Sequence, residues 1–79
     1  MLENNITIYP NPAINRVTIN NPRSIPLKSF LIHDIQGRMI KKSFSTSESI
    51  DISALQNGIY FITIKSLEAT TTKRLIVTN

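Results

Sequence analysis

The side chains that could carry out chemistry in this sequence are few and lie far apart. The one histidine, His33, falls at an outward-facing position of an expected strand, where a lone histidine is far more often a surface residue than a catalyst. A hydrolase needs a nucleophile with a base and an orienting acid within reach. No such set can be assembled around His33. We therefore expect a binding or targeting module with no catalytic residue, and not an enzyme.

The carboxylates and glycines predict no ligand site either. Four carboxylates stand singly beside or within expected turns: Asp34, Glu48, Asp51 and Glu68. A metal ion needs several such ligands gathered together. Gly37 and Gly58 belong to separate turns, so they cannot form a loop that cradles phosphate. We expect no metal and no cofactor.

The net charge is positive, but the basic residues are scattered. Nine lysines and arginines against five acids give a charge of +4 over 79 residues. Only Lys41–Lys42 and Lys73–Arg74 are adjacent, and neighbours on a strand point to opposite faces. Because a basic stripe and aromatic stacking platforms are both missing, we expect no nucleic-acid partner.

Composition also limits the cellular context. The chain has no cysteine, which excludes disulfides and thiolate metal sites. No apolar run is long enough for a membrane span, and residues 1–5 lack the basic and apolar parts of a signal peptide. We expect either a cytosolic protein or a piece of a longer exported one.

Alternating apolar and polar residues predict a protein made only of β-strands. Val17 and Ile19, for example, alternate with polar neighbours over residues 16–20. The expected strands are 6–9, 16–20, 28–33, 38–44, 49–52, 58–66 and 70–78. About seven short antiparallel strands with no helical period indicate a small immunoglobulin-like Greek-key β-sandwich. We expect one domain over residues 6–79, with residues 1–5 as a linker remnant or an artificial start.

Two turns have clear chemistry. Pro10-Asn11-Pro12 ends the first strand in a rigid turn, because proline lacks a ladder donor and restricts the residue before it. Asp34 to Gly37 fits a type I turn, with aspartate first and glycine fourth. The strand that returns from it carries Ile40 and Met39 as its apolar residues.

The segment before the sixth strand predicts a tyrosine corner. Leu55, Gly58 and Tyr60 are spaced so that the phenol can bond back to upstream backbone and fix a crossover between sheets. Ser53 is expected to cap the single turn that precedes it. Ile59 and Phe61 fall on the other face of the same strand, as a ligand surface or, the reading we favour, under a neighbouring loop.

The last segment leaves two alternatives open. Leu75, Ile76 and Val77 run together where an alternating strand would place a polar residue. If the strand lies inside a sheet, both of its faces are buried. If it lies at an edge, it offers unpaired backbone and apolar side chains to a partner strand, and a dimer through that edge stays an alternative.

The order of motifs along the chain resembles the type A C-terminal sorting domain of proteins exported by the bacterial type IX secretion system. The matching residues are Tyr9-Pro10-Asn11-Pro12-Ala13, Val17, Ile19, Ile32-His33-Asp34, Gly37-Arg38, Ile50-Asp51-Ile52, Leu55, Asn57-Gly58-Ile59-Tyr60-Phe61 and Lys73-Arg74-Leu75-Ile76-Val77. His33 departs from the pattern where an aromatic is usual, and Thr78-Asn79 replaces a basic end.

The resemblance implies a secretion signal. Such a domain is similar to the tail of a larger cargo that crosses the periplasm, is recognised by the secretion machinery, and reaches the cell surface or medium of a Gram-negative bacterium. A sortase-like peptidase of the outer membrane then typically removes the tail.

Two sets of residues would carry these roles. The sorting signal is assigned to Lys73, Arg74, Leu75, Ile76, Val77, Thr78 and Asn79. The structural motif comprises Pro10, Asn11, Pro12, Gly37, Leu55, Gly58 and Tyr60. The alternative function is an immunoglobulin-like adhesion or carbohydrate-binding module, which the lack of tryptophan disfavours.

Overall fold

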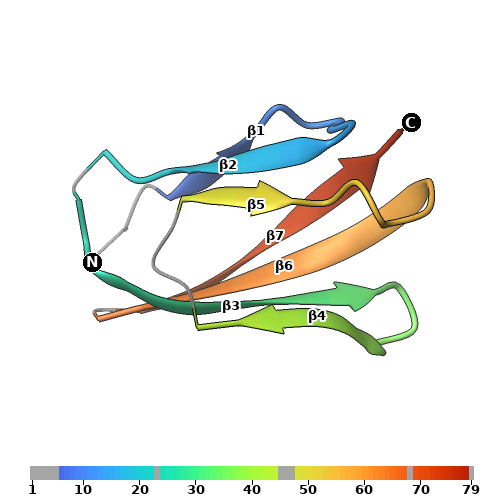
Figure 1. The fold of residues 1–79 in the computed structure, drawn as a ribbon. Helices are drawn as coiled ribbons and strands as arrows, with labels where there is room; N and C mark the ends of the chain where they lie inside the picture. Colours follow the sequence, from blue (N-terminus) through green and yellow to red (C-terminus); the bar gives the residue numbers. More distant parts are fainter. Residues whose placement is uncertain (1–5, 23, 45–47, 68, 79) are drawn as a thin grey trace.

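The chain folds into two antiparallel β-sheets packed face to face (Figure 1). The computed structural model describes residues 6–22, 24–44, 48–67 and 69–78. Its strands are β1 (Thr7–Tyr9), β2 (Arg16–Asn20), β3 (Leu27–Asp34), β4 (Met39–Ser43), β5 (Ser49–Asp51), β6 (Gly58–Ser66) and β7 (Thr70–Val77). The prediction of an all-β, immunoglobulin-like sandwich of seven strands is confirmed, whereas the prediction for residues 1–5 lies outside the described residues.

Three hairpins and three crossovers build the two layers. One sheet has the order β1-β2-β5 and the other has the order β4-β3-β6-β7. β1–β2, β3–β4 and β6–β7 are hairpins within a sheet, whereas the segments after β2, β4 and β5 cross between sheets. β6 is paired with β3 on one side and with β7 on the other, so it anchors the larger sheet.

The core lies between the sheets and follows from the alternation of the strands. In β2, Val17 and Ile19 are fully buried while Arg16 and Asn20 are exposed. The fully buried large side chains are Ile6, Val17, Ile19, Ile32, Ile50, Ile52, Ile62, Ile64, Leu75 and Val77. Burying one such aliphatic side chain is worth about 1.5–3 kcal/mol. The hydrophobic effect therefore holds this cysteine-free fold together.

The β3–β4 hairpin turns at Asp34–Gly37, as predicted. The Gly37 amide donates to the Asp34 carbonyl at 3.0 Å, and Gly37 has a φ of 87°. That left-handed conformation favours glycine, and a three-residue hairpin loop commonly requires it after a type I turn. The turn positions β4 beside β3 at the edge of the sheet.

Strand β4 contributes nothing apolar to the core. Met39 is 60% exposed and Ile40 is 42% exposed. Because only three strands face four, the smaller sheet leaves an edge of the larger one uncovered. Sequence alternation alone could not reveal which strand would lie beyond that cover.

Candidate functional site

The strand that carries the predicted sorting residues lies at an edge of the four-stranded sheet. β7 pairs with β6 from Thr70 to Val77. Leu75 and Val77 point into the core and are buried, whereas Arg74 is exposed and Ile76 is half-buried on the opposite face. The strand therefore alternates and lies at an edge, so of the two alternatives the interior strand with both faces buried does not apply.

The outer edge of β7 is covered by the turn after β1. The Asn11 side-chain amide donates to the Arg74 carbonyl at 2.7 Å, and its Oδ1 accepts from the Ile76 amide at 3.0 Å. Ala13 continues this pairing, because its amide donates to the Ile76 carbonyl at 2.7 Å and its carbonyl accepts from Thr78 at 2.8 Å. Asn11 thus occupies the edge positions that a neighbouring strand would fill.

This Asn11–Ala13 latch corrects the open-edge alternative. The latch pairs with residues Arg74 to Thr78, at the end of β7 and just beyond it, so a strand from a partner would have to displace the latch to pair there. A dimer through this stretch of edge has the same requirement. The peptide bonds before Pro10 and Pro12, which flank Asn11, are both cis. Asn79, the last predicted signal residue, lies outside the described residues.

The crossover from β5 to β6 contains a tyrosine corner. The Tyr60 hydroxyl donates to the Gln56 carbonyl at 2.7 Å, and the Leu55 amide donates to the Ile52 carbonyl at 3.0 Å. Leu55 packs against the core as a partly buried residue. The corner fixes where β6 begins, and β6 in turn positions β7.

The cap of that crossover is Asp51, and the prediction of Ser53 is wrong. The Asp51 carboxylate accepts from the Ser53 amide at 2.9 Å. This bond, with the Ser53 hydroxyl, lowers the pKa of Asp51 below its ordinary value of 3.8. Asp51 is the cap because the carboxylate of an aspartate can accept a hydrogen bond from the amide two residues along the chain, as in an Asx turn.

The outer face of the four-stranded sheet combines apolar and basic side chains, and we call it the basic face. Its apolar members are Leu31, Met39, Ile59, Phe61 and Ile76, and its basic members are Lys42, Lys65 and Arg74 together with His33. Ile59 is 45% exposed and Phe61 is 36% exposed. The expectation that a loop covers these two residues is therefore wrong.

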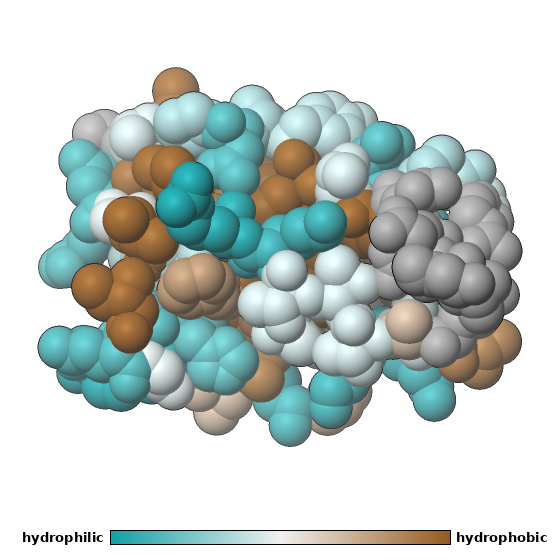
Figure 2. All heavy atoms as spheres, turned by 180° about the vertical axis from the view of Figure 1, so that it is seen from behind, coloured by the Kyte–Doolittle hydropathy of each residue, from teal (hydrophilic) through white to brown (hydrophobic). Residues whose placement is uncertain are grey.

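Register places the basic face in rows across the strands. His33 lies opposite Phe61, and Phe61 lies opposite Arg74. Ile59 lies opposite Ile76 in the next row. In Figure 2, which views the molecule from behind, brown apolar atoms gather beside teal polar ones at the end where β6 begins and β7 ends. His33 thus belongs to a surface that combines apolar and basic side chains.

None of the three described carboxylates contributes to the basic face. Asp34 points to the other side of β3, where it accepts from the Arg38 side chain at 2.8 Å and from the Gln36 and Arg38 amides. The Arg38 amide is the main cause that lowers the pKa of Asp34. Asp51 ends β5 of the other sheet, and Glu48 precedes β5, where its carbonyl accepts from the Ile19 amide of β2. The described charges of the basic face are therefore uncompensated within the fold.

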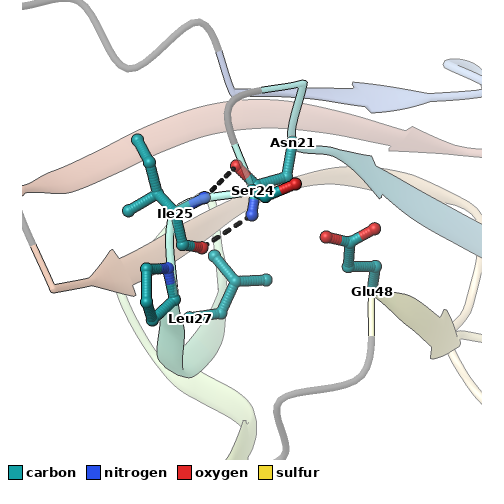
Figure 3. Close-up of a pocket in the computed structure, with 6 residues that line it drawn as sticks. Asn21, Ser24, Ile25, Leu27 and Glu48 are labelled. Carbon is teal, nitrogen blue, oxygen red and sulfur yellow. Dashed lines mark hydrogen bonds between the residues drawn. The ribbon is translucent and has the colours of Figure 1, made fainter.

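Two shallow pockets lie at opposite ends of β3. One of about 280 Å³ lies between the turn after β2 and Glu48 (Figure 3). There the Asn21 side chain holds both backbone groups of Ile25, at 2.7 and 3.2 Å. The other, of about 270 Å³, lies between the β3–β4 turn and the tyrosine corner. Among the described residues, no group of His, Asp and Glu could hold a metal ion.

The fold and this site define an immunoglobulin-like sandwich whose last strand is latched at its edge by the turn after the first strand. A family profile described as "Secretion system C-terminal sorting domain" matches residues 7–78. The chain therefore belongs to this family of type IX secretion sorting domains, as its motifs indicated.

A solved structure shares the fold. It is PorZ of Porphyromonas gingivalis, described as an essential bacterial surface component of the type-IX secretion system. The identity is 20% and the TM-score is 0.69, with 95% of this chain covered. This chain spans 12% of the length of the PorZ chain. No curated protein matches the sequence. The described residues include no helix with the length and apolar character of a membrane span.

Sequence reasoning missed two features of the site. The latch depends on contacts between residues 63 and 65 positions apart in the chain, so the only local signal was an asparagine between two prolines. The basic face depends on which residues oppose each other across four strands. Correct register could have found it, because its members in β3, β6 and β7 alternate with core residues.

Proposed function

We propose that this chain is the sorting signal of a larger cargo protein, which it directs through the outer membrane by the type IX secretion system. Family membership over residues 7–78 carries the proposal. A sorting tail of this family marks a secreted or cell-surface protein of a Gram-negative bacterium. In this proposal the folded tail is recognised in the periplasm, and a sortase-like peptidase of the outer membrane removes it after export.

The structure supports a role in binding. β7 is held on one side by β6 and on the other by the latch, so its outward side chains are presented at fixed positions. A fixed surface costs little conformational entropy when a partner binds it. We propose recognition of this kind, with no catalytic step performed by the domain.

A cargo fusion tests the proposal. A reporter with a secretory signal peptide is joined to the N-terminus of this chain and expressed in a bacterium that has a type IX system. We expect the reporter at the cell surface or in the medium, with the tail removed. The reporter without this chain, and the full fusion in a strain without the translocon, should both stay in the periplasm.

A truncation of the last strand cannot test the signal, because it would remove recognised residues and destabilise the fold together. Removing residues 75–79 would also remove Leu75 and Val77, which are 0% and 1% exposed in the core. Loss of export would then follow from unfolding alone. Substitutions at outward positions of β7 separate the two effects. Periplasmic retention of the intact fusion in the competent strain would refute the proposed function.

A further inference from the structure

We propose that the secretion machinery binds this domain through the basic face, by a protein surface with acidic side chains beside an apolar patch. This inference rests on the proposed function and names the chemistry of the partner. It moves the recognised element from a terminal segment to a surface that four strands build together.

The latch argues against recognition by strand addition at the end of β7. A partner strand gains its affinity from unpaired backbone groups at a sheet edge. From Arg74 to Thr78 those groups already bond to Asn11 and Ala13. The side chains of Arg74 and Ile76 remain on the outer face, where a partner can reach them without breaking any backbone bond.

The apolar centre of the basic face matches the centre of a protein interface. Ile59 and Phe61 of β6 lie beside Ile76 of β7, and they are exposed although aliphatic and aromatic. Interfaces typically have an apolar, aromatic-rich centre with a polar rim, and arginine is enriched there. Arg74, directly opposite Phe61, fits that pattern.

The charged side chains of the basic face indicate which charge its partner should carry. Arg74 of β7 lies in the same row as Phe61, and Lys42 of β4 lies one row further along the sheet. Lys65 of β6 follows in the row after that, so the three cations extend from one side of the apolar centre, and no described carboxylate lies among them. Complementary potential favours an acidic partner and disfavours a basic one. Lipid recognition commonly requires clusters of four to eight basic residues. Three that are spread over separate strands beside apolar side chains favour a protein partner.

The first test uses the cargo fusion with substitutions that keep strand-forming residues. Phe61→Thr combined with Ile76→Thr removes the apolar centre, and Lys42→Glu combined with Arg74→Glu reverses the charge. We expect each pair to lower the surface fraction of the reporter by about tenfold or more, because central contacts dominate interface energies. Circular dichroism of the purified variants should show melting close to that of the parent.

Matched controls lie elsewhere on the domain. Lys41→Glu changes the neighbouring residue of β4, which points to the opposite side of the sheet from Lys42. Tyr9→Thr removes an aromatic residue that is 53% exposed on the other sheet. Both should leave export at the parent level. If the basic-face variants melt normally and export normally while the parent is exported, the inference is wrong and the proposed function stands.

Cross-linking tests the nature of the partner without depending on destabilised variants. A photoreactive phenylalanine analogue replaces Phe61 in one fusion and Tyr9 in another. We expect a protease-sensitive protein adduct at Phe61, lost when Arg74→Glu is added, and no such adduct at Tyr9. A protease-resistant lipopolysaccharide adduct at Phe61, or equal adducts at both positions, would overturn the inference. Retention of the unaltered fusion would instead refute the proposed function.

Discussion

The outer faces of the two sheets differ in how their polar groups are satisfied. On the three-stranded sheet, Arg16 donates to the Ser49 hydroxyl at 2.6 Å and Asn20 donates to the Thr7 hydroxyl at 3.3 Å. Arg16 also lies opposite Asp51 in the register. This face pairs its own donors and charges. The basic face instead places Arg74 opposite Phe61 and exposes Ile59 without a covering segment.

The three-stranded face satisfies its polar groups internally, whereas the basic face has the composition on which the proposed partner site rests. A solvated face gains little from exposed isoleucine and phenylalanine, and exposed apolar groups that cluster commonly mark interaction sites. On the basic face, the hydroxyl groups of Thr63 and Thr72 form a hydrogen bond of 3.1 Å. The Lys42 Nζ lies 5.1 Å from the centroid of the Phe44 ring. These contacts order the surface, but no carboxylate of the described residues balances its positive charge.

The largest effect on stability is expected on the core-facing side of β7, and a substitution on its outward side provides the comparison. Leu75→Ala removes a fully buried side chain and should lower the free energy of unfolding by about 2–5 kcal/mol. Ile76→Ala, one residue later on the outer side, should cost less stability yet reduce export more per unit of folded protein. Chemical denaturation and the cargo fusion measure the two quantities. Equal losses of stability would contradict the assigned faces.

The second effect concerns the latch. Asn11→Ala removes both hydrogen bonds to the edge of β7, so it should cost about 1–3 kcal/mol. Amide hydrogen exchange at Ile76 should also become faster. Asn20→Ala on the other sheet, which loses one bond between side chains, is the control and should change stability less. An unchanged exchange rate at Ile76 would show that Asn11 does not hold the edge.

The third effect tests the corner. Tyr60→Phe deletes the bond to the Gln56 carbonyl and should cost about 1 kcal/mol, while export persists in the folded fraction. Tyr9→Phe removes a hydroxyl from an exposed ring and should leave stability unchanged. Thermal melting of both variants measures the difference. If Tyr60→Phe is as stable as the parent, the corner bond is not stabilising.

The smallest effect is a dependence on pH at the hairpin of the larger sheet. The folded state lowers the pKa of Asp34 below 3.8, so its stabilising contribution is present above about pH 4 and is lost as the pH falls through the folded pKa. Asp34→Asn should therefore be less stable than the parent at pH 7, and the difference should shrink toward pH 2. A gap between their melting temperatures that does not change with pH would contradict this linkage.

Local patterns predicted most of the fold. The observed bounds of β2 and β6 are those expected from alternation, and the turn at Asp34–Gly37 has the expected hydrogen bond. These features depend on near neighbours in the chain, whose chemistry is readable directly. The candidate site was predicted less well, because the assigned segment at residues 73–79 mixes core residues such as Leu75 with outward ones such as Arg74.

The sequence by itself determined the strands, their turns and the corner before β6, because each depends on residue type and short spacing. Only the tertiary structure decided that Asn11 closes the edge of β7 and that β4 lies beyond the cover of the smaller sheet. It also placed β3 beside β6, so that His33 lies opposite Phe61 although β4 and β5 separate the two strands in the chain. These contacts depend on which strands become neighbours in the sheets. The order of the strands is determined by burial of the whole core, and not by any short stretch of sequence.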